Sequence, residues 1–112
     1  MFDKTLEKLC NANGIAGAED AIAQIIIDEI KDYCHYQIDN LGNILAFKKG
    51  RETPRKKIML AAHMDEVGFI VTGYTSDGNL SFAKVGGVDD RVIIGRQVVV
   101  GPEKIPGVIG TK

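Results

Sequence analysis

A histidine and two carboxylates lie close together near the middle of this 112-residue chain, at His63, Asp65 and Glu66. Imidazole nitrogens and carboxylate oxygens are common protein ligands of divalent metals, so the cluster has metal-binding chemistry. In an extended backbone alternate side chains share a face, which would place His63 beside Asp65. A neutral imidazole could then bind a metal through one nitrogen while Asp65 accepts a hydrogen bond from the other.

The same spacing also fits other roles. A histidine at the end of a strand is often a hydrogen-bonded structural residue, and the pattern alone does not separate this role from a metal ligand for His63. Glu66 fits an acceptor behind the site, a salt-bridge partner or a surface residue. These alternatives stay open at the level of spacing.

Five apolar residues, from Ile58 to Ala62, lead directly into the cluster. Such a run predicts a strand that is buried on both faces of a sheet. Open α/β sheets bind ligands just outside the carboxyl ends of their strands, so His63 and Asp65 would lie where chemistry is expected.

The residues before this strand predict two helices and a hairpin. Apolar residues at helical spacing indicate a short helix over residues 3–12, with Asp3 as its N-cap. A second helix begins near Asp20 and has an isoleucine-rich stripe that needs a sheet to pack on. Two strands are expected on either side of a turn at 39–42, followed by an exposed loop at 48–57.

The second half of the chain predicts short strands and turns, with no helix. A turn signal at residues 74–79 favours a hairpin, and residues from 72 onward are typical of a small all-β unit. The predicted fold class is therefore α/β, with an α/β unit followed by this β-rich unit. The strand-like runs are Phe69–Thr72, Leu80–Lys84, Val92–Ile94, Val98–Val100 and Val108–Ile109.

Composition argues against some classes of partner. The formal net charge is −1, with 14 basic and 15 acidic residues, so there is no electrostatic case for nucleic acid or an anionic membrane. No apolar run approaches the roughly 20 residues that span a bilayer. The first residues lack the features of a signal peptide, so we expect a cytoplasmic location, with Cys10 and Cys34 as buried, reduced thiols.

Two other features have weaker chemical interpretations. His35 is expected at a helix end, where a structural role is favoured. Asp89 and Asp90 follow two glycines and could hold a cation weakly, but a polar turn is the favoured interpretation.

The stretch Ala61–Phe69 is similar to the metal-site signature of the M42 family of metallo-aminopeptidases. This group includes glutamyl aminopeptidases and tetrahedral aminopeptidases, and some members have been labelled endoglucanases. Three further stretches resemble the family in the right order, so the resemblance extends over essentially the whole chain. They are the helix entry Asn13–Glu19, the turn Asp39–Asn43 and the strand Gly107–Gly110.

The resemblance implies part of a zinc-peptidase-type α/β catalytic domain, interrupted by a PDZ-like β-barrel used in assembly. Residues 1–71 would belong to the catalytic domain and residues 72–112 to the start of the barrel. The family site holds two divalent metal ions, zinc or cobalt; His63 would be a metal ligand, and Asp65 the catalytic-site carboxylate that orients it. The implied partners are peptide substrates and further copies of the chain, in dimers that assemble into dodecamers.

The sequence also departs from the family pattern. The bridging aspartate, the general-base glutamate, the other carboxylate ligands and a second histidine ligand have no counterpart here, so the chain resembles the amino-terminal third of an aminopeptidase and is expected to be inactive alone. One alternative is a β-rich interaction module in which His63 is only structural. Another is a glycoside hydrolase of the same fold, although such enzymes usually need two positioned carboxylates rather than a dinuclear metal site.

Overall fold

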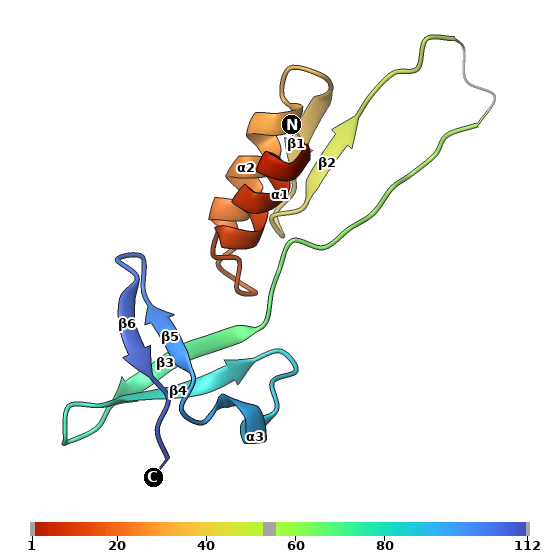
Figure 1. The fold of residues 1–112 in the computed structure, drawn as a ribbon. Helices are drawn as coiled ribbons and strands as arrows, with labels where there is room; N and C mark the ends of the chain where they lie inside the picture. The colour runs from red at the N-terminus through yellow and green to blue at the C-terminus, as the bar shows by residue number, and fades with distance from the viewer. Residues whose placement is uncertain (1, 53–55, 112) are drawn as a thin grey trace. The chain divides into compact units, whose positions relative to one another are not determined.

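The computed structural model describes residues 2–52 and 56–111, whose helices and strands are drawn in Figure 1. Contacts within the chain divide it into two compact units, Met1–Glu66 and Val67–Lys112. Part of the exposed loop predicted at 48–57 lies outside the described residues, and the described part of that loop is exposed.

Two helices begin the first unit, α1 at Phe2–Asn11 and α2 at Asp20–Ile30. They contact each other, and an ion pair of 3.3 Å joins Lys8 of α1 to Glu29 of α2. Both predicted helices are confirmed. Asp3 is not the N-cap, because α1 begins one residue earlier and Asp3 lies in its first turn. Its negative charge still complements the helix dipole there.

A glycine turn leads into α2. Gly17 has φ 90°, a conformation that is open to glycine and strained for other residues. Its N–H donates to Oε1 of Glu19 over 2.8 Å, and the N–H of Ala18 donates to the carbonyl of Ile15 over 2.8 Å. One turn further on, Ile22 is buried, whereas the other isoleucines of α2 are half-buried.

Strands β1 (His35–Ile38) and β2 (Ile44–Phe47) pair as an antiparallel hairpin (Figure 1). Its turn is organised by Asp39, whose Oδ1 accepts the N–H groups of Leu41 and Asn43, both over 2.9 Å. A side chain that bonds to the backbone two residues further on forms an Asx-turn, which favours this chain reversal. The predicted strand, turn and strand are confirmed.

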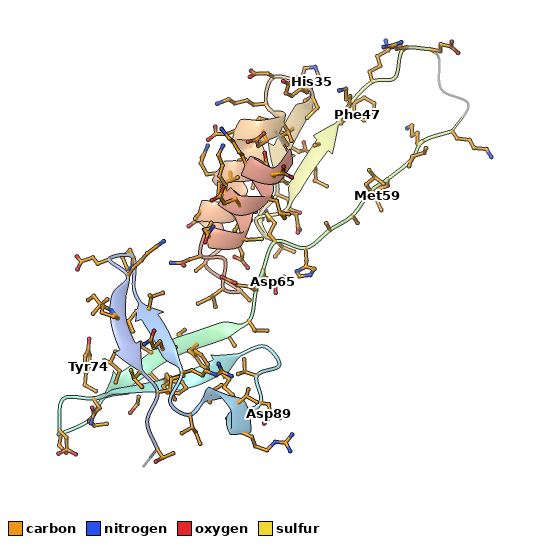
Figure 2. The ribbon with its side chains drawn as sticks, viewed as in Figure 1. His35, Phe47, Met59, Asp65, Tyr74 and Asp89 are labelled. Atoms are coloured by element: carbon orange, nitrogen blue, oxygen red, sulfur yellow. The ribbon has the colours of Figure 1, made fainter. Side chains whose placement is uncertain are left out.

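The stretch from Ile58 to Ala62 is extended but pairs with no strand among the described residues. The prediction of a strand buried on both faces is therefore wrong: Ile58 and Met59 are each 88 % exposed, and Leu60 is 92 % exposed. Figure 2 shows Met59 on this uncoiled stretch. A buried strand needs neighbours for its backbone N–H and C=O groups, and these neighbours are missing from the described residues.

The second unit begins with the longest hairpin, formed by β3 (Gly68–Tyr74) and β4 (Leu80–Val85). The rings of Phe69 and Phe82 meet edge to face across it, with centroids 5.0 Å apart. Such aromatic pairs stabilise a sheet face beyond their burial. The hairpin predicted around the turn at 74–79 is confirmed, although Tyr74 is the last residue of β3.

A second antiparallel hairpin, β5 (Gln97–Val100) and β6 (Ile105–Val108), ends the described chain. Ile109 follows β6 and is buried. Its N–H donates to the carbonyl of Arg96 over 3.0 Å, and its carbonyl accepts the N–H of Gly95 over 2.8 Å. Backbone pairing therefore continues past the last strand residue.

One segment of this unit was predicted to be a strand and is a helix. Residues 92–94 overlap α3 (Asp90–Ile93), a single turn between β4 and β5. Asp89 caps this turn, because its Oδ1 accepts the N–H of Arg91 over 2.9 Å. The cap overrides the β-propensity of the run Val92–Ile94, which periodicity alone cannot reveal.

The mixture of helices and strands confirms the α/β composition of the prediction. The described strands form three separate two-stranded sheets, none of which closes into a barrel. Within the described part of the chain, no helix has both the length and the apolar character needed to cross a membrane.

Candidate metal-ligand site

His63 and Asp65 lie against each other at the end of the extended stretch, as side-chain alternation predicts. Nδ1 of His63 is 3.0 Å from the backbone oxygen of Asp65 and 3.1 Å from its carboxylate Oδ1. Both partner atoms are acceptors, so Nδ1 is assigned as the protonated nitrogen that donates to them. Figure 2 labels Asp65 at this point of the chain.

The second ring nitrogen of His63, Nε2, keeps its lone pair in this tautomer. The His63 side chain is 84 % exposed, and that of Asp65 is 49 % exposed. The ring is therefore not packed as a core histidine would be. A neutral imidazole whose Nδ1–H is held by a carboxylate is the form that binds a metal through Nε2.

Glu66, the residue after this pair, is hydrogen-bonded to Gly14, which lies 52 residues earlier in the chain. The N–H of Glu66 donates to the carbonyl of Gly14 over 2.7 Å, and the N–H of Gly14 donates to Oε1 of Glu66 over 3.1 Å. Ile15 and Glu66 also form an isolated parallel β-bridge. The carboxylate of Glu66 is thus an acceptor for a backbone N–H.

Gly14 is the point at which this loop needs a residue without a side chain. It is buried, and a Cβ added there would lie 2.6 Å from Cγ1 of Ile22 and 3.3 Å from the carbonyl oxygen of Met64. The bare backbone therefore lets the extended stretch approach α2 closely. Local sequence patterns around Gly14 do not show this contact, because its partner Glu66 lies 52 residues away.

The described residues of this chain do not form a complete metal site. No group of three His, Cys, Asp or Glu side chains among them could hold a metal ion. A catalytic zinc normally takes three protein ligands, whereas His63 offers one nitrogen and Asp65 stands behind it. These residues fit a single ligand position of a metal site, so no reaction step through a metal is derived from them.

The other histidine and the cysteines lie elsewhere. His35 is the first residue of β1 rather than the end of a helix, because α2 ends at Ile30. Cys10 and Cys34 are free thiols, as expected, but Cys10 is exposed and Cys34 is half-buried, so the prediction that both are buried is wrong. None of these three side chains belongs to a metal-binding group among the described residues.

Asp89 and Asp90 each pair with a basic side chain. Asp89 accepts from Nε and Nη2 of Arg91 over 3.1 and 2.6 Å, and these hydrogen bonds lower the pKa of the Asp89 carboxyl. Oδ2 of Asp90 accepts from Nζ of Lys84 over 3.0 Å. Both carboxylates are balanced by neighbouring cations, which does not favour a role for this pair in holding a metal.

A histidine whose second ring N–H is held by a carboxylate or a backbone carbonyl is a common arrangement for a metal ligand, and His63 has both acceptors. Residues 42–112 match the model of the M42 glutamyl aminopeptidase family. The chain belongs to this family.

Two relatives illustrate the similarity. The chain is 46 % identical over 99 residues to a putative aminopeptidase of Acetivibrio thermocellus, covering 88 % of this chain and 29 % of the relative. It is 34 % identical over 101 residues to the lysyl aminopeptidase of Pyrococcus furiosus, covering 88 % of this chain and 28 % of the relative. The chain thus spans less than a third of the length of the curated relatives it matches.

Solved structures share the fold over almost the whole chain. The Pyrococcus horikoshii TET1 peptidase, described as assembling into a tetrahedron or a large octahedral shell, is 42 % identical with a TM-score of 0.82, covering 100 % of this chain and 34 % of that one. A Thermotoga maritima protein described as an endoglucanase is 40 % identical with a TM-score of 0.85, covering 96 % of this chain and 34 % of that one.

Proposed function

We propose that this chain supplies part of a metal-dependent aminopeptidase, which removes N-terminal residues from peptides. The observation that supports this most directly is the pair formed by His63 and Asp65, with Nδ1 of the ring 3.1 Å from Oδ1 and the side chain 84 % exposed. Membership of the M42 glutamyl aminopeptidase family supports the reaction class.

In this proposal His63 binds a divalent ion through Nε2, and Asp65 is the catalytic-site carboxylate that fixes the ring. The family resemblance implies two zinc or cobalt ions, which when bound would polarise the scissile carbonyl and activate a water molecule. Asp65 acts on the ring alone: its carboxylate holds Nδ1–H and so fixes the tautomer and the orientation of the ring. The remaining ligands and the general base come from residues outside this chain, so the 112 residues alone are expected to be inactive.

The domain assignment and assembly also belong to the proposal. Residues 1–71 would be catalytic-domain sequence, and residues 72–112 would begin a PDZ-like barrel that joins copies of the protein. Three apolar side chains of the β5 and β6 hairpin are more than half exposed, at 58 % for Val99, 56 % for Ile105 and 68 % for Val108, which fits a surface that is covered in an assembly. The assemblies described for the TET1 peptidase support homo-oligomers, with peptides as substrates.

A cobalt(II) titration of the chain tests the metal role. We expect weak binding, seen as a visible absorption band, that is lost in His63→Ala and kept in the control His35→Ala. His35 is the other histidine of the chain and begins β1. Equal spectra for wild type and His63→Ala would contradict a ligand role for His63.

A chimera tests the activity itself. In it this chain replaces the matching segment of the Pyrococcus furiosus lysyl aminopeptidase. We expect the chimera to release N-terminal amino acids. His63→Ala should lower this activity by at least about a hundredfold, because it removes a protein ligand of the catalytic metal. Full activity with His63→Ala would refute the assignment.

The exposed β-rich hairpins favour one alternative, a non-catalytic interaction module. In that case His63→Ala would leave the activity of the chimera unchanged, and cobalt would not bind at this position. The likeness to a protein described as an endoglucanase motivates a second assay. Release of sugars, rather than amino acids, by the chimera would favour a glycoside hydrolase.

A further inference from the structure

The peptide unit between Asp65 and Glu66 connects the imidazole to the loop at Gly14. Its carbonyl oxygen lies 3.0 Å from Nδ1 of His63, and its N–H donates to the carbonyl of Gly14 over 2.7 Å. A trans peptide is planar, so its C=O and N–H point in opposite directions and rotate together. A rotation that broke one of these contacts would disturb the other.

The carboxylate of Glu66 makes a second hydrogen bond to Gly14. Its Oε1 accepts the N–H of Gly14 over 3.1 Å, so the two residues exchange two hydrogen bonds. Gly14 is buried, and a buried N–H without a partner is costly. The side chain of Glu66 therefore stabilises the position of Gly14, whose carbonyl in turn holds the peptide that contacts His63.

We infer that Glu66 is a positioning residue for His63. Through Gly14 and the planar peptide that follows Asp65, it keeps the ring in the Nδ1–H form with Nε2 open to a ligand. That the ligand is a metal rests on the proposed function, whereas the positioning is a property of the metal-free chain.

The test compares three variants of the full 112-residue chain. Glu66→Ala removes the acceptor, Glu66→Gln keeps an oxygen that can accept the Gly14 N–H, and Glu7→Ala is the control. Glu7 is an exposed glutamate on α1 of the same unit. Long-range ¹H–¹⁵N spectra report the tautomer of His63, and amide hydrogen exchange reports the Gly14 N–H.

In the wild type we expect mainly the Nδ1–H tautomer and a protected Gly14 amide. In Glu66→Ala we expect both tautomers to be populated and Gly14 to exchange about tenfold faster, as the loss of one hydrogen bond to a charged group implies. Glu66→Gln should restore the tautomer and bring exchange within about threefold of wild type. Glu7→Ala should match wild type in both readouts.

A wild-type tautomer in Glu66→Ala would overturn the inference, because a merely structural glutamate would not change the ring. If Glu66→Ala loses its helical circular dichroism, Glu66→Met decides instead, since methionine has a similar length without a strong acceptor. A folded Glu66→Met chain with mixed tautomers supports the inference. A folded Glu66→Met chain with the wild-type tautomer contradicts it.

The cobalt titration separates this inference from the proposed function. If Glu66 controls the tautomer but cobalt does not bind through His63, the positioning role stands and the metal role fails. If cobalt binds through His63 while Glu66→Ala leaves the tautomer unchanged, the metal role stands and the inference fails.

Discussion

Two neighbouring stretches of the first unit are held in very different ways. Residues 58–62 are entirely apolar, yet they lie exposed and pair with no strand among the described residues. Residues 63–66 are mostly polar and exposed, yet hydrogen bonds fix His63 against Asp65 and Glu66 against Gly14.

The difference shows how much surrounding structure each kind of contact needs. A hydrogen bond to a side chain two residues away, or to one buried glycine, needs only a few atoms in place. Burial of a strand needs whole neighbouring strands, because every second side chain faces each side of the sheet. The contacts of the site are therefore present although the apolar stretch has no strand partner among the described residues.

The largest effect is expected from the apolar stretch. Fully burying one large apolar side chain stabilises by roughly 1.5–3 kcal/mol, so three exposed ones should drive copies of the chain together. Replacing Ile58 and Leu60 by Thr and Met59 by Lys should raise the dissociation constant for self-association by at least about a hundredfold, measured by sedimentation velocity.

The control for this prediction is Leu41→Lys. Leu41 is also 88 % exposed but lies alone in the turn between β1 and β2. It should leave self-association unchanged. A wild-type chain that stays monomeric at high concentration would show that the exposed apolar stretch drives no association.

Within the hydrogen-bonded stretch at residues 63–66 and its partner Gly14, the largest loss of stability is expected from Gly14→Ala. The added Cβ would lie 2.6 Å from Cγ1 of Ile22, and overpacking of this kind costs about 1–3 kcal/mol. Urea unfolding should show this loss, whereas Gly50→Ala should change the free energy of unfolding by less than about 0.5 kcal/mol. A Cβ at Gly50 would lie 3.8 Å from the backbone oxygen of Glu52, an ordinary van der Waals contact. Equal stability for the two variants would contradict the close approach at Gly14.

Asp65→Ala should weaken cobalt binding without unfolding the chain. Partners that orient a ligand histidine typically contribute tenfold to a hundredfold in metal affinity, so a loss of about that size is expected. Asp77→Ala, an exposed aspartate in the turn between β3 and β4, should leave affinity unchanged. An Asp65→Ala chain that binds cobalt as tightly as wild type would remove the orienting role of this carboxylate.

The smallest expected effect is the response of the Asp39 turn to pH. Asp39 accepts hydrogen bonds within its own turn, as Asp65 accepts one from His63. The hydrogen bond from the side chain of Asn43, with further bonds from backbone N–H groups, lowers the pKa of the Asp39 carboxyl. A lowered pKa in the folded state means that the contribution is complete above the unfolded-state pKa and is lost as pH falls through the folded-state pKa. NMR signals of the turn at residues 39–43 should therefore be constant from neutral pH to mildly acidic pH and change only in strong acid.

Asp39→Asn is the control for this titration, since its side chain does not ionise. Its signals from the turn at residues 39–43 should lack the acid transition of the wild type. A wild-type transition at or above the ordinary aspartate range would contradict the lowered pKa.

Local patterns predicted much of the fold. The helices and the hairpins at β1 to β4 follow from side-chain spacing and turn residues such as Asp39 and Gly78, because these signals act over a few residues. The local patterns failed at residues 92–94, where the helix cap from Asp89 outweighs the β-propensity of the run. The stretch from Ile58 failed for the opposite reason, since its expected neighbours are not among the described residues.

The candidate site was predictable only in part. Two-residue spacing was enough to place His63 beside Asp65, and the structure brings their atoms within 3.1 Å. The link from Glu66 to Gly14 joins residues 52 positions apart, and no periodicity connects them. Long-range backbone contacts of this kind come from the packed fold rather than from a sequence motif.

The most direct test of the account is a zinc titration of ¹⁵N-histidine-labelled chain, followed by long-range ¹H–¹⁵N spectra. The account predicts that Nδ1 of His63 stays protonated while the Nε2 resonance moves on adding zinc, with His35 unchanged. Protonation of Nε2 in the metal-free chain, or an Nε2 resonance that does not respond to zinc, would contradict it.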